Sequence, residues 1–314
     1  MNRSFTELTP LRVLRSIPLS YDIPDLEGEV LIRRGKSFSN RLLKNIARRA
    51  GPSGKTVLLR DHPLFGKDLL HAIKEIPFYS LLMHHSPANP FEKVSNKASL
   101  PSWGIQALEY FKRQDPDTYW HCLRVFALTA YMALHFIQQQ RRKVLVASMG
   151  PLHDVGKIAV PLSVLQKRTP LTREERDQLR HHVLAGAVLH SYYQYPENSL
   201  GAKVALEHHE RLDGSGYPFG LRLKDPMVEL IALCDVYDAL ISPRPYRNRA
   251  YDLRTCLEVL TDMAINGTFS LNLVRFLISL HRREKTDYRK LILPKEKRGQ
   301  PPEENYYGQV LAEK

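Results

Sequence analysis

Residues 152–158 read Leu-His-Asp-Val-Gly-Lys-Ile, and this short stretch decides how the rest of the chain is interpreted. A histidine and an aspartate stand side by side among apolar residues, where burying an unpaired carboxylate would be costly. A bound cation would satisfy that carboxylate, so His153 and Asp154 are candidate metal ligands. A histidine–aspartate pair alone is a weak signal, and its surroundings decide whether it marks a site.

Further candidate ligands recur at nearly even intervals on both sides of this pair. Each step is 26 to 32 residues along the series His121, His153, His182, His208 and Asp235. A step of this size is about one helix plus a connection, which would place each candidate on a successive helix. Inward-pointing imidazoles and carboxylates on facing helices are how helical bundles build metal sites. Adjacent pairs such as His208-His209 can address two ions, with a carboxylate bridging them.

The hydrophobic pattern agrees with a bundle. Between residues 105 and 282, apolar residues recur every three or four positions, which indicates amphipathic helices. The expected helices cover 105–113, 117–139, 142–150, 172–191, 199–209, 226–241, 252–265 and 270–281. The predicted fold class is therefore mainly α.

The residues before this region have a mixed pattern. Runs at 30–32 and 56–59 are typical of strands, and 40–50 has apolar positions at helical spacing. Residues 86–104 are rich in Ser, Pro, Asn and Gly, which favours a domain boundary there. We therefore expect three parts: a small α/β domain at 1–100, regulatory or dimer-forming; a helical domain at 105–282; and a basic, partly irregular tail at 283–314.

Composition excludes several classes of protein. The 314 residues are 43% hydrophobic and 25% charged, values of an ordinary globular protein. Three cysteines without a CxxC pair indicate buried thiols in a reducing compartment. The chain contains no apolar run of transmembrane length and no secretory signal, which predicts a cytoplasmic protein.

The chain is strongly basic, with a formal net charge of +13. Residues 1–60 alone hold twelve Lys and Arg against five Asp and Glu. Such a surface can attract nucleic acid, anionic lipid or a polyphosphate ligand. Aromatic residues are sparse among these cations, which argues against nucleic acid, and the charge alone is also what an ordinary solvated basic face would show.

The motifs around the pair closely resemble those of the HD metal-dependent phosphohydrolase superfamily. The residues that match are His121-x-x-Arg124-Val125 and His153-Asp154-Val155-Gly156-Lys157. Residues 208–218, His-His-Glu-Arg-Leu-Asp-Gly-Ser-Gly-Tyr-Pro, narrow the resemblance to the HD-GYP subfamily. Supporting matches are His182-x3-Gly186, Asp235-x2-Asp238-Ala239-Leu240 and Arg244-Pro245-Tyr246-Arg247. The resemblance covers about residues 115–265 and implies an HD-type helical bundle.

The resemblance also implies an activity and its cofactors. HD-GYP domains are phosphodiesterases that convert cyclic di-GMP to pGpG or GMP, with two or three divalent ions that are commonly iron or manganese. The implied ligands are His121, His153, Asp154, His182, His208, His209 and Asp235. Asp154 would bridge two ions. Asp117 fits a position for a third ion, but it is shorter than the glutamate that three-metal members often have there.

Other residues acquire roles by the same resemblance. The expected catalytic group comprises His153, Asp154 and Lys157, with Lys157 as a fixed positive charge on the phosphate. The expected substrate-binding residues are Lys157, Gly216, Tyr217, Pro218, Arg244 and Arg247. Glu210 is expected to orient a metal-bound histidine or its helix. The loop that contains Gly216 is also a candidate contact for diguanylate cyclase (GGDEF) domains.

Three alternatives stay open. A related hydrolase could act on another cyclic dinucleotide, such as cyclic GMP–AMP, since the residues that select the base are not evident from the sequence. A non-catalytic receptor or scaffold could bind the nucleotide or a cyclase; retention of every motif residue argues against it. Nucleic-acid binding through the basic N-terminal part would show steep salt dependence.

Overall fold

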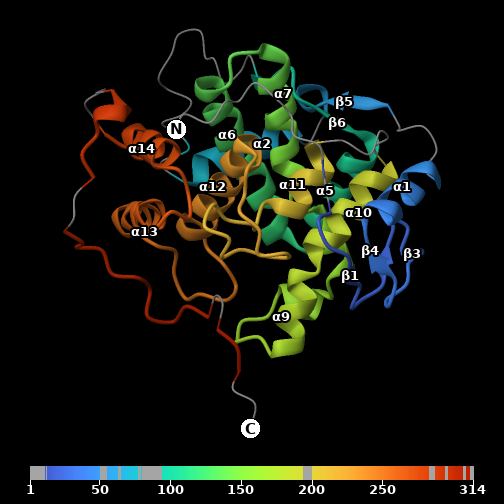
Figure 1. Cartoon of the computed structure of the whole chain (residues 1–314). Helices are drawn as coiled ribbons and strands as arrows, with labels where there is room; N and C mark the ends of the chain where they lie inside the picture. Colours follow the sequence, from blue (N-terminus) through green and yellow to red (C-terminus); the bar gives the residue numbers. More distant parts are fainter. Residues whose placement is uncertain are drawn as a thin grey trace.

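The computed structural model describes residues 11, 13–49, 55–62, 65–76, 79, 94–193, 200–282, 287–293, 296–306 and 309–311. Helices gather around a central group, and the short strands lie at the edge of the molecule (Figure 1). The prediction of a mainly α fold is confirmed. Residues 86–93 of the predicted boundary at 86–104 lie outside the described residues.

The strands form three antiparallel pairs. β1 (Ile17–Pro18) pairs with β4 (Ser37–Phe38), β2 (Ile23–Pro24) with β3 (Val30–Ile32), and β5 (Thr56–Leu58) with β6 (Ser99–Pro101). β3 and β5 fall on the two runs predicted as strands. Helix α1 (Asn40–Arg49) falls on the predicted helix and buries Leu43, Ile46 and Ala47, while its basic residues face solvent.

Among the remaining helices, those at 65–75 and 162–165 were not predicted, and the others lie on or close to the predicted ranges. The remaining helices are α2 (Phe65–Glu75), α5 (Ser102–Gln114), α6 (Pro116–Phe136), α7 (Gln140–Met149), α8 (Leu162–Leu165), α9 (Arg173–Arg180), α10 (His182–Tyr193), α11 (Leu200–Glu207), α12 (Pro226–Ile241), α13 (Leu253–Ile265) and α14 (Leu271–Leu280). Short 3₁₀ turns η1 (Leu59–Asp61), η2 (Gly150–Leu152), η3 (Val155–Ala159) and η4 (Tyr288–Lys290) connect some of them.

One segment predicted as a single helix forms two helices. The pattern at 172–191 predicts a single helix, but the structure has α9 and α10 with His181 between them. Thr172 and Glu175 form a capping box that starts α9, and no residue of α9 is buried. α10, in contrast, is buried from His182 to Ser191. The two segments therefore have different environments, which periodicity alone does not reveal.

Helix α6 lies at the centre of the main core because nearly its whole length is buried. It packs against α2, α5, α7 and α12. A helix that is apolar on most faces is stable only inside a bundle. His121, in its second turn, is thereby held in the interior with 1% of its surface exposed.

The N-terminal residues do not have a core of their own among the described residues. Residues from α2 and β6 join the main core around α6. Phe38, Leu43 and Ile46 form a second core with Val183 and Val188 of α10, into which Phe219 also packs. The predicted division between residues 1–100 and the helical part therefore does not separate two cores.

The described part of the C-terminal tail lies on the body of the protein. Backbone N–H groups of Arg298 and Gly299 donate to Glu258 of α13. Farther on, the N–H of Tyr306 donates to the carbonyl of Tyr246. The described residues of the tail contain one 3₁₀ turn, η4, and no other helix. Among the described helices, none combines the length and the apolar character needed to cross a bilayer.

Candidate metal centre

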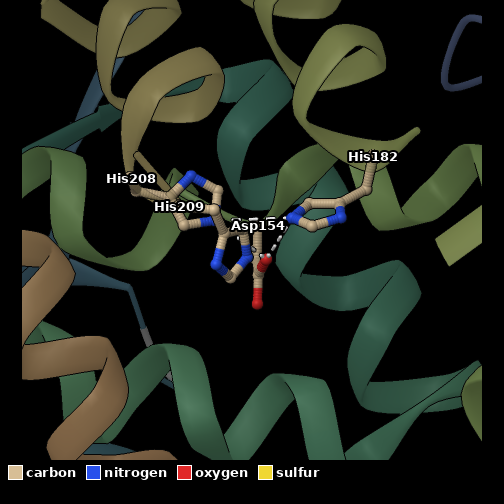
Figure 2. Close-up of side chains that lie close together, drawn as sticks. All are labelled: Asp154, His182, His208 and His209. Atoms are coloured by element: carbon tan, nitrogen blue, oxygen red, sulfur yellow. Dashed lines mark hydrogen bonds and ion pairs between the residues drawn. The ribbon is translucent and has the colours of Figure 1, made fainter. Parts of the chain in front are cut away.

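Seven of the eight predicted ligands converge in the interior. They form two adjoining groups, Asp154 with His182, His208 and His209, and His121 with His153 and Asp235. Within each group the candidate ligand atoms lie within 4.8 Å of one another. Figure 2 shows the first group, in which three imidazoles surround one carboxylate. The side chains come from α6, α10, α12 and the segments that follow η2 and α11.

Asp154 faces both groups at once. Its Oδ1 is 3.3 Å from Nε2 of His182 and 3.7 Å from Nε2 of His208. Its Oδ2 is 3.3 Å from Nε2 of His153 and 3.6 Å from Nε2 of His121. Each carboxylate oxygen thus belongs to a different group. This is the arrangement that a bridging carboxylate between two cations requires.

Fixed acceptors determine which ring nitrogen of four histidines faces the cluster. Nδ1 of His153 is 2.6 Å from the carbonyl oxygen of Gly150, and Nδ1 of His182 is 2.6 Å from that of Leu179. Nδ1 of His208 lies 2.9 Å from the carbonyl of Val204. A carbonyl only accepts, so these Nδ1 atoms carry hydrogen and leave the Nε2 lone pairs for a cation.

Asp238 does the same for His121; from the sequence it is named only as part of a motif and has no assigned role. Its Oδ2 lies 2.7 Å from Nδ1 of His121. Its Oδ1 accepts from Nε of Arg124 at 2.7 Å, from Tyr79 at 3.0 Å and from Ser242 at 2.9 Å. The available signal was a second carboxylate in the apolar helix α12, three residues after Asp235.

Two glycines allow the close backbone approaches on which the cluster depends. A Cβ atom on Gly156 would lie 1.9 Å from the carbonyl oxygen of His182 and 2.4 Å from the nitrogen of Gly186. A Cβ atom on Gly216 would lie 2.2 Å from the carbonyl oxygen of His209. Only glycine permits contacts this close. η3 therefore rests directly on α10, which brings Asp154 to His182.

The loop that follows His209 is held by a buried carboxylate. Glu210 accepts from the backbone N–H groups of Phe219 at 2.8 Å and Leu221 at 2.9 Å. Burial raises the pKa of Glu210, and these backbone donors act against that rise. The expected role for Glu210, orienting a histidine or helix, is replaced by organisation of this loop. Tyr217 of the loop stacks on His209, with ring centroids 4.5 Å apart.

The predicted substrate-binding cations have different surroundings. Nζ of Lys157 is 2.6 Å from Oδ2 of Asp154. Nη2 of Arg244 is 2.7 Å from Nδ1 of His121 and 3.5 Å from Asp238. Both therefore lie beside the cluster.

Arg247 has a structural position instead. Its Nη2 donates to the carbonyl oxygens of Ala239, Leu240 and Ser242 at 2.7–2.9 Å. These are carbonyls at the end of α12 that lack partners within the helix. Arg247 therefore caps the end of α12 through Nη2, and its contact with a substrate phosphate stays a prediction.

Asp117 does not join either group. It lies in the first turn of α6, one turn before His121, and is exposed. The cluster thus contains the seven ligands implied for two ions, without the additional acidic position.

Electrostatics inside the cluster are strongly coupled. Burial would lower the pKa of His153, but the carboxylates of Asp154 and Asp235 raise it to about 10. Burial lowers the pKa of His182 to about 3. Burial would raise the pKa of Asp235, but His121 and His153 hold it well below its usual range. A cation that binds here replaces a proton on His153, so its affinity should fall with acidification.

Comparison with known proteins identifies the family. A family model described as HD domain matches residues 109–269. The chain is 37% identical over 137 residues to a cyclic di-GMP phosphodiesterase of Thermotoga maritima, covering 43% of this chain and 37% of that protein. It is 39% identical over 160 residues to a cyclic di-GMP phosphodiesterase of Pseudomonas aeruginosa, covering 49% and 38%.

A third relative differs in its named substrate. A 3'3'-cGAMP-specific phosphodiesterase of Vibrio cholerae is 30% identical over 206 residues, covering 59% of this chain and 46% of that protein. In all three cases the chain matches less than half of the relative's length.

Proposed function

This chain belongs to the HD domain family, and we propose that it is a metal-dependent phosphodiesterase that hydrolyses cyclic di-GMP to pGpG, GMP or both. Two cyclic di-GMP phosphodiesterases among its relatives support that substrate. Hydrolysis would lower the level of this second messenger.

One observation carries the proposal. The carboxylate of Asp154 directs one oxygen to each of two histidine groups, whose Nε2 atoms are freed by partners on Nδ1. Nε2 of His182 and Nε2 of His208 are only 3.4 Å apart, and two facing lone pairs repel unless a cation lies between them. Nε2 of His153 is buried, and among the described residues it faces only the carboxylates of Asp154 at 3.3 Å and Asp235 at 3.8 Å rather than a well-formed hydrogen bond.

The donor set fits two divalent ions. Imidazole nitrogens with carboxylate oxygens suit iron, manganese and zinc, and the absence of thiolate from both groups disfavours softer metals. We propose iron or manganese. His182, His208 and His209 would hold one ion, His121, His153 and Asp235 the other, and Asp154 both. When bound, the ions supply positive charge for the phosphoryl oxygens and lower the pKa of a water.

The residues of the chain then orient the substrate and balance charge. Lys157 places an ammonium group 2.6 Å from Asp154, where it can also attract the phosphoryl oxygens as they gain negative charge. Burial would lower the pKa of Lys157, but Asp154 raises it, so the group stays charged. Arg244 lies beside His121 on the other group and can donate to a phosphate oxygen.

A second substrate is favoured by one comparison. The match to the 3'3'-cGAMP-specific enzyme extends over 59% of this chain, more than either cyclic di-GMP enzyme above. Both nucleotides have the same phosphodiester chemistry, so the cluster would serve either. Base selection must then come from residues outside it.

The test combines metal content with turnover. Protein purified without chelator should contain two ions per chain by elemental analysis and should release pGpG or GMP from cyclic di-GMP. Faster turnover of 3'3'-cGAMP would select the second substrate. A loaded but inactive protein would favour a receptor role.

The double variant His153→Ala with Asp154→Ala should lose all hydrolysis while its circular dichroism remains helical. Activity in that variant would contradict the assigned site. Contact with a diguanylate cyclase domain and formation of a homodimer stay predictions, as does a cytoplasmic location.

A further inference from the structure

Most cations near the cluster already have partners in the protein. Lys157 contacts Asp154, Arg244 forms an ion pair with Asp238, and Arg247 donates to carbonyls of α12. Arg211 donates to the carbonyl oxygens of His208 and Glu210. Their hydrogen-bonding capacity is at least partly used before a ligand arrives.

Arg180 is different. It is the last residue of α9 and is exposed. Its guanidinium lies over the ring of Tyr217, 4.9 Å from the ring centroid. Within the part of the chain that the structure describes, its N–H groups have no hydrogen-bond acceptor and no ion pair. The side chain is therefore held by an aromatic ring while its donors stay available.

A series of ring contacts links this arginine to the cluster. Tyr217, under the guanidinium, stacks on His209 with an interplanar angle of 16°. His209 in turn lies 4.1 Å from His208, centroid to centroid, and belongs to the ligand group around Asp154. Arg180 thus lies just outside the cluster, on the side of His209 and Tyr217.

A cyclic dinucleotide needs a cation at such a place. Its two phosphodiesters lie on opposite sides of one macrocycle, so only one of them can meet the cluster at a time. The other carries a full negative charge, and an arginine with free donors binds a phosphate well. We propose that Arg180 binds the second phosphodiester of the cyclic dinucleotide, an inference that rests on the proposed function.

Support of the loop does not require Arg180. Glu210 fixes Phe219 and Leu221 by hydrogen bonds, and Gly216 packs against the backbone of His209. α9 buries none of its residues. Shortening an exposed side chain at its end should therefore leave both the fold and the cluster intact.

The experiment compares two substrates and three variants. Arg180→Ala should raise KM for cyclic di-GMP about tenfold or more, the usual effect of losing a charged hydrogen bond. Its kcat/KM for bis(p-nitrophenyl) phosphate, which has a single phosphodiester, should match the wild type. Arg173→Ala, an exposed arginine in the first turn of the same helix, is the matched control and should change neither. In Arg180→Lys, KM for cyclic di-GMP should lie between the values of Arg180→Ala and the wild type.

A binding measurement without turnover separates the inference from the proposed function. Fluorescently labelled cyclic di-GMP and 3'3'-cGAMP are titrated with protein in excess chelator and followed by anisotropy. Binding by the wild type that weakens in Arg180→Ala, and not in Arg173→Ala, supports the contact. Equal binding by all three proteins overturns it while leaving the function intact. Loss of bis(p-nitrophenyl) phosphate hydrolysis in Arg180→Ala also overturns it, because the cluster itself would then be disturbed. If the wild type neither binds nor hydrolyses either dinucleotide, both proposals are wrong.

Discussion

At the scale of single residues, Asp238 shows how a buried carboxylate can orient a candidate metal ligand without belonging to either ligand group. It fixes Nδ1 of His121 and also accepts from Arg124. Burial would raise its pKa, but Arg124 and His121 hold it well below the usual range. Asp238 therefore stays ionised and keeps the imidazole in one orientation.

Replacing this carboxylate should weaken metal binding. We expect Asp238→Asn to lower metal affinity about 10- to 100-fold, the usual effect of losing such a partner, and to reduce stability because Arg124 loses its counter-charge. The control is Asp225→Asn, which removes another fully buried carboxylate, paired with Lys203 at 3.1 Å. Metal titration and urea unfolding would measure both effects. Equal metal affinity in the two variants would assign Asp238 a purely structural role.

A second prediction at this scale concerns pH. Burial lowers the pKa of His281 to about 3, and its Nε2 lies 3.3 Å from the hydroxyl of Tyr237. Below pH 6.5 the unfolded chain takes up a proton at this residue and the folded protein does not, so stability falls with acidification until about pH 3.

The matching variant is His281→Gln, which keeps a polar partner for Tyr237 without the titration. Between pH 7.5 and 5, wild-type protein should lose more unfolding free energy than the variant, by on the order of 1–2 kcal/mol. Urea titrations at the two pH values measure the difference. If wild type and variant differed in unfolding free energy by the same amount at both pH values, His281 would be accessible to protons in the folded protein.

The candidate ligands could be predicted from sequence because a metal site demands particular residue types at particular intervals. His121, His153 and Asp235 needed only motif and spacing to be selected. The roles of Arg247 and Glu210 could not be predicted, because both depend on which backbone groups lie within reach. An arginine near a site and an arginine that caps a helix look the same in sequence.

At the scale of elements, the contact between η3 and α10 determines the geometry of the centre. Gly156 in η3 lies against the backbone of His182 and Gly186. Gly186 is also confined, though less tightly, since a Cβ atom there would lie 2.9 Å from the side chain of Ala205 in α11. Three elements thus meet through small residues. The ligands they carry are brought within reach of one another as a result.

A single methyl group should separate these elements. Gly156→Ala places a Cβ atom 1.9 Å from the carbonyl oxygen of His182, a distance that forces η3 away from α10. We expect a loss of about 1–3 kcal/mol in stability and a large loss of bound metal. The control is Gly66→Ala in α2, where a Cβ atom would meet nothing within 4 Å and helix propensity should stabilise slightly. Normal metal content in Gly156→Ala would contradict this account of the contact.

The helices themselves were predictable because each buries an apolar face, and burial imposes a period on the sequence. α12 was predicted at 226–241 and is found there. The break at His181 was not predicted, since α9 and α10 together keep a helical period while only α10 is buried. Periodicity reports which residues can form a helix, and only packing decides where one helix ends and the next begins.

At the scale of the whole molecule, the N-terminal segment is part of the structure around the site. Phe38 of β4 lies 6.5 Å from Phe219, centroid to centroid, in the core shared with α10. Nη2 of Arg15 donates to the carbonyl of Phe219 at 3.1 Å. These contacts join residues more than 180 positions apart, which no local pattern in the sequence can reveal. They also place N-terminal residues in direct contact with the loop that contains Tyr217.

Phe38→Ala tests whether this contact stabilises the loop. Removing a fully buried phenylalanine should cost about 3–5 kcal/mol in stability, and it should also loosen the loop because Phe219 loses its neighbour. Phe65→Ala is the matched control: Phe65 is buried against Phe126 in the main core, away from the loop. Under native conditions, the amides of Phe219 and Leu221 should exchange hydrogen faster in Phe38→Ala than in Phe65→Ala, once each rate is corrected for global stability. Equal corrected rates would show that the N-terminal segment stabilises the fold without acting on the loop, whereas a selective increase would make it a means of controlling access to the cluster.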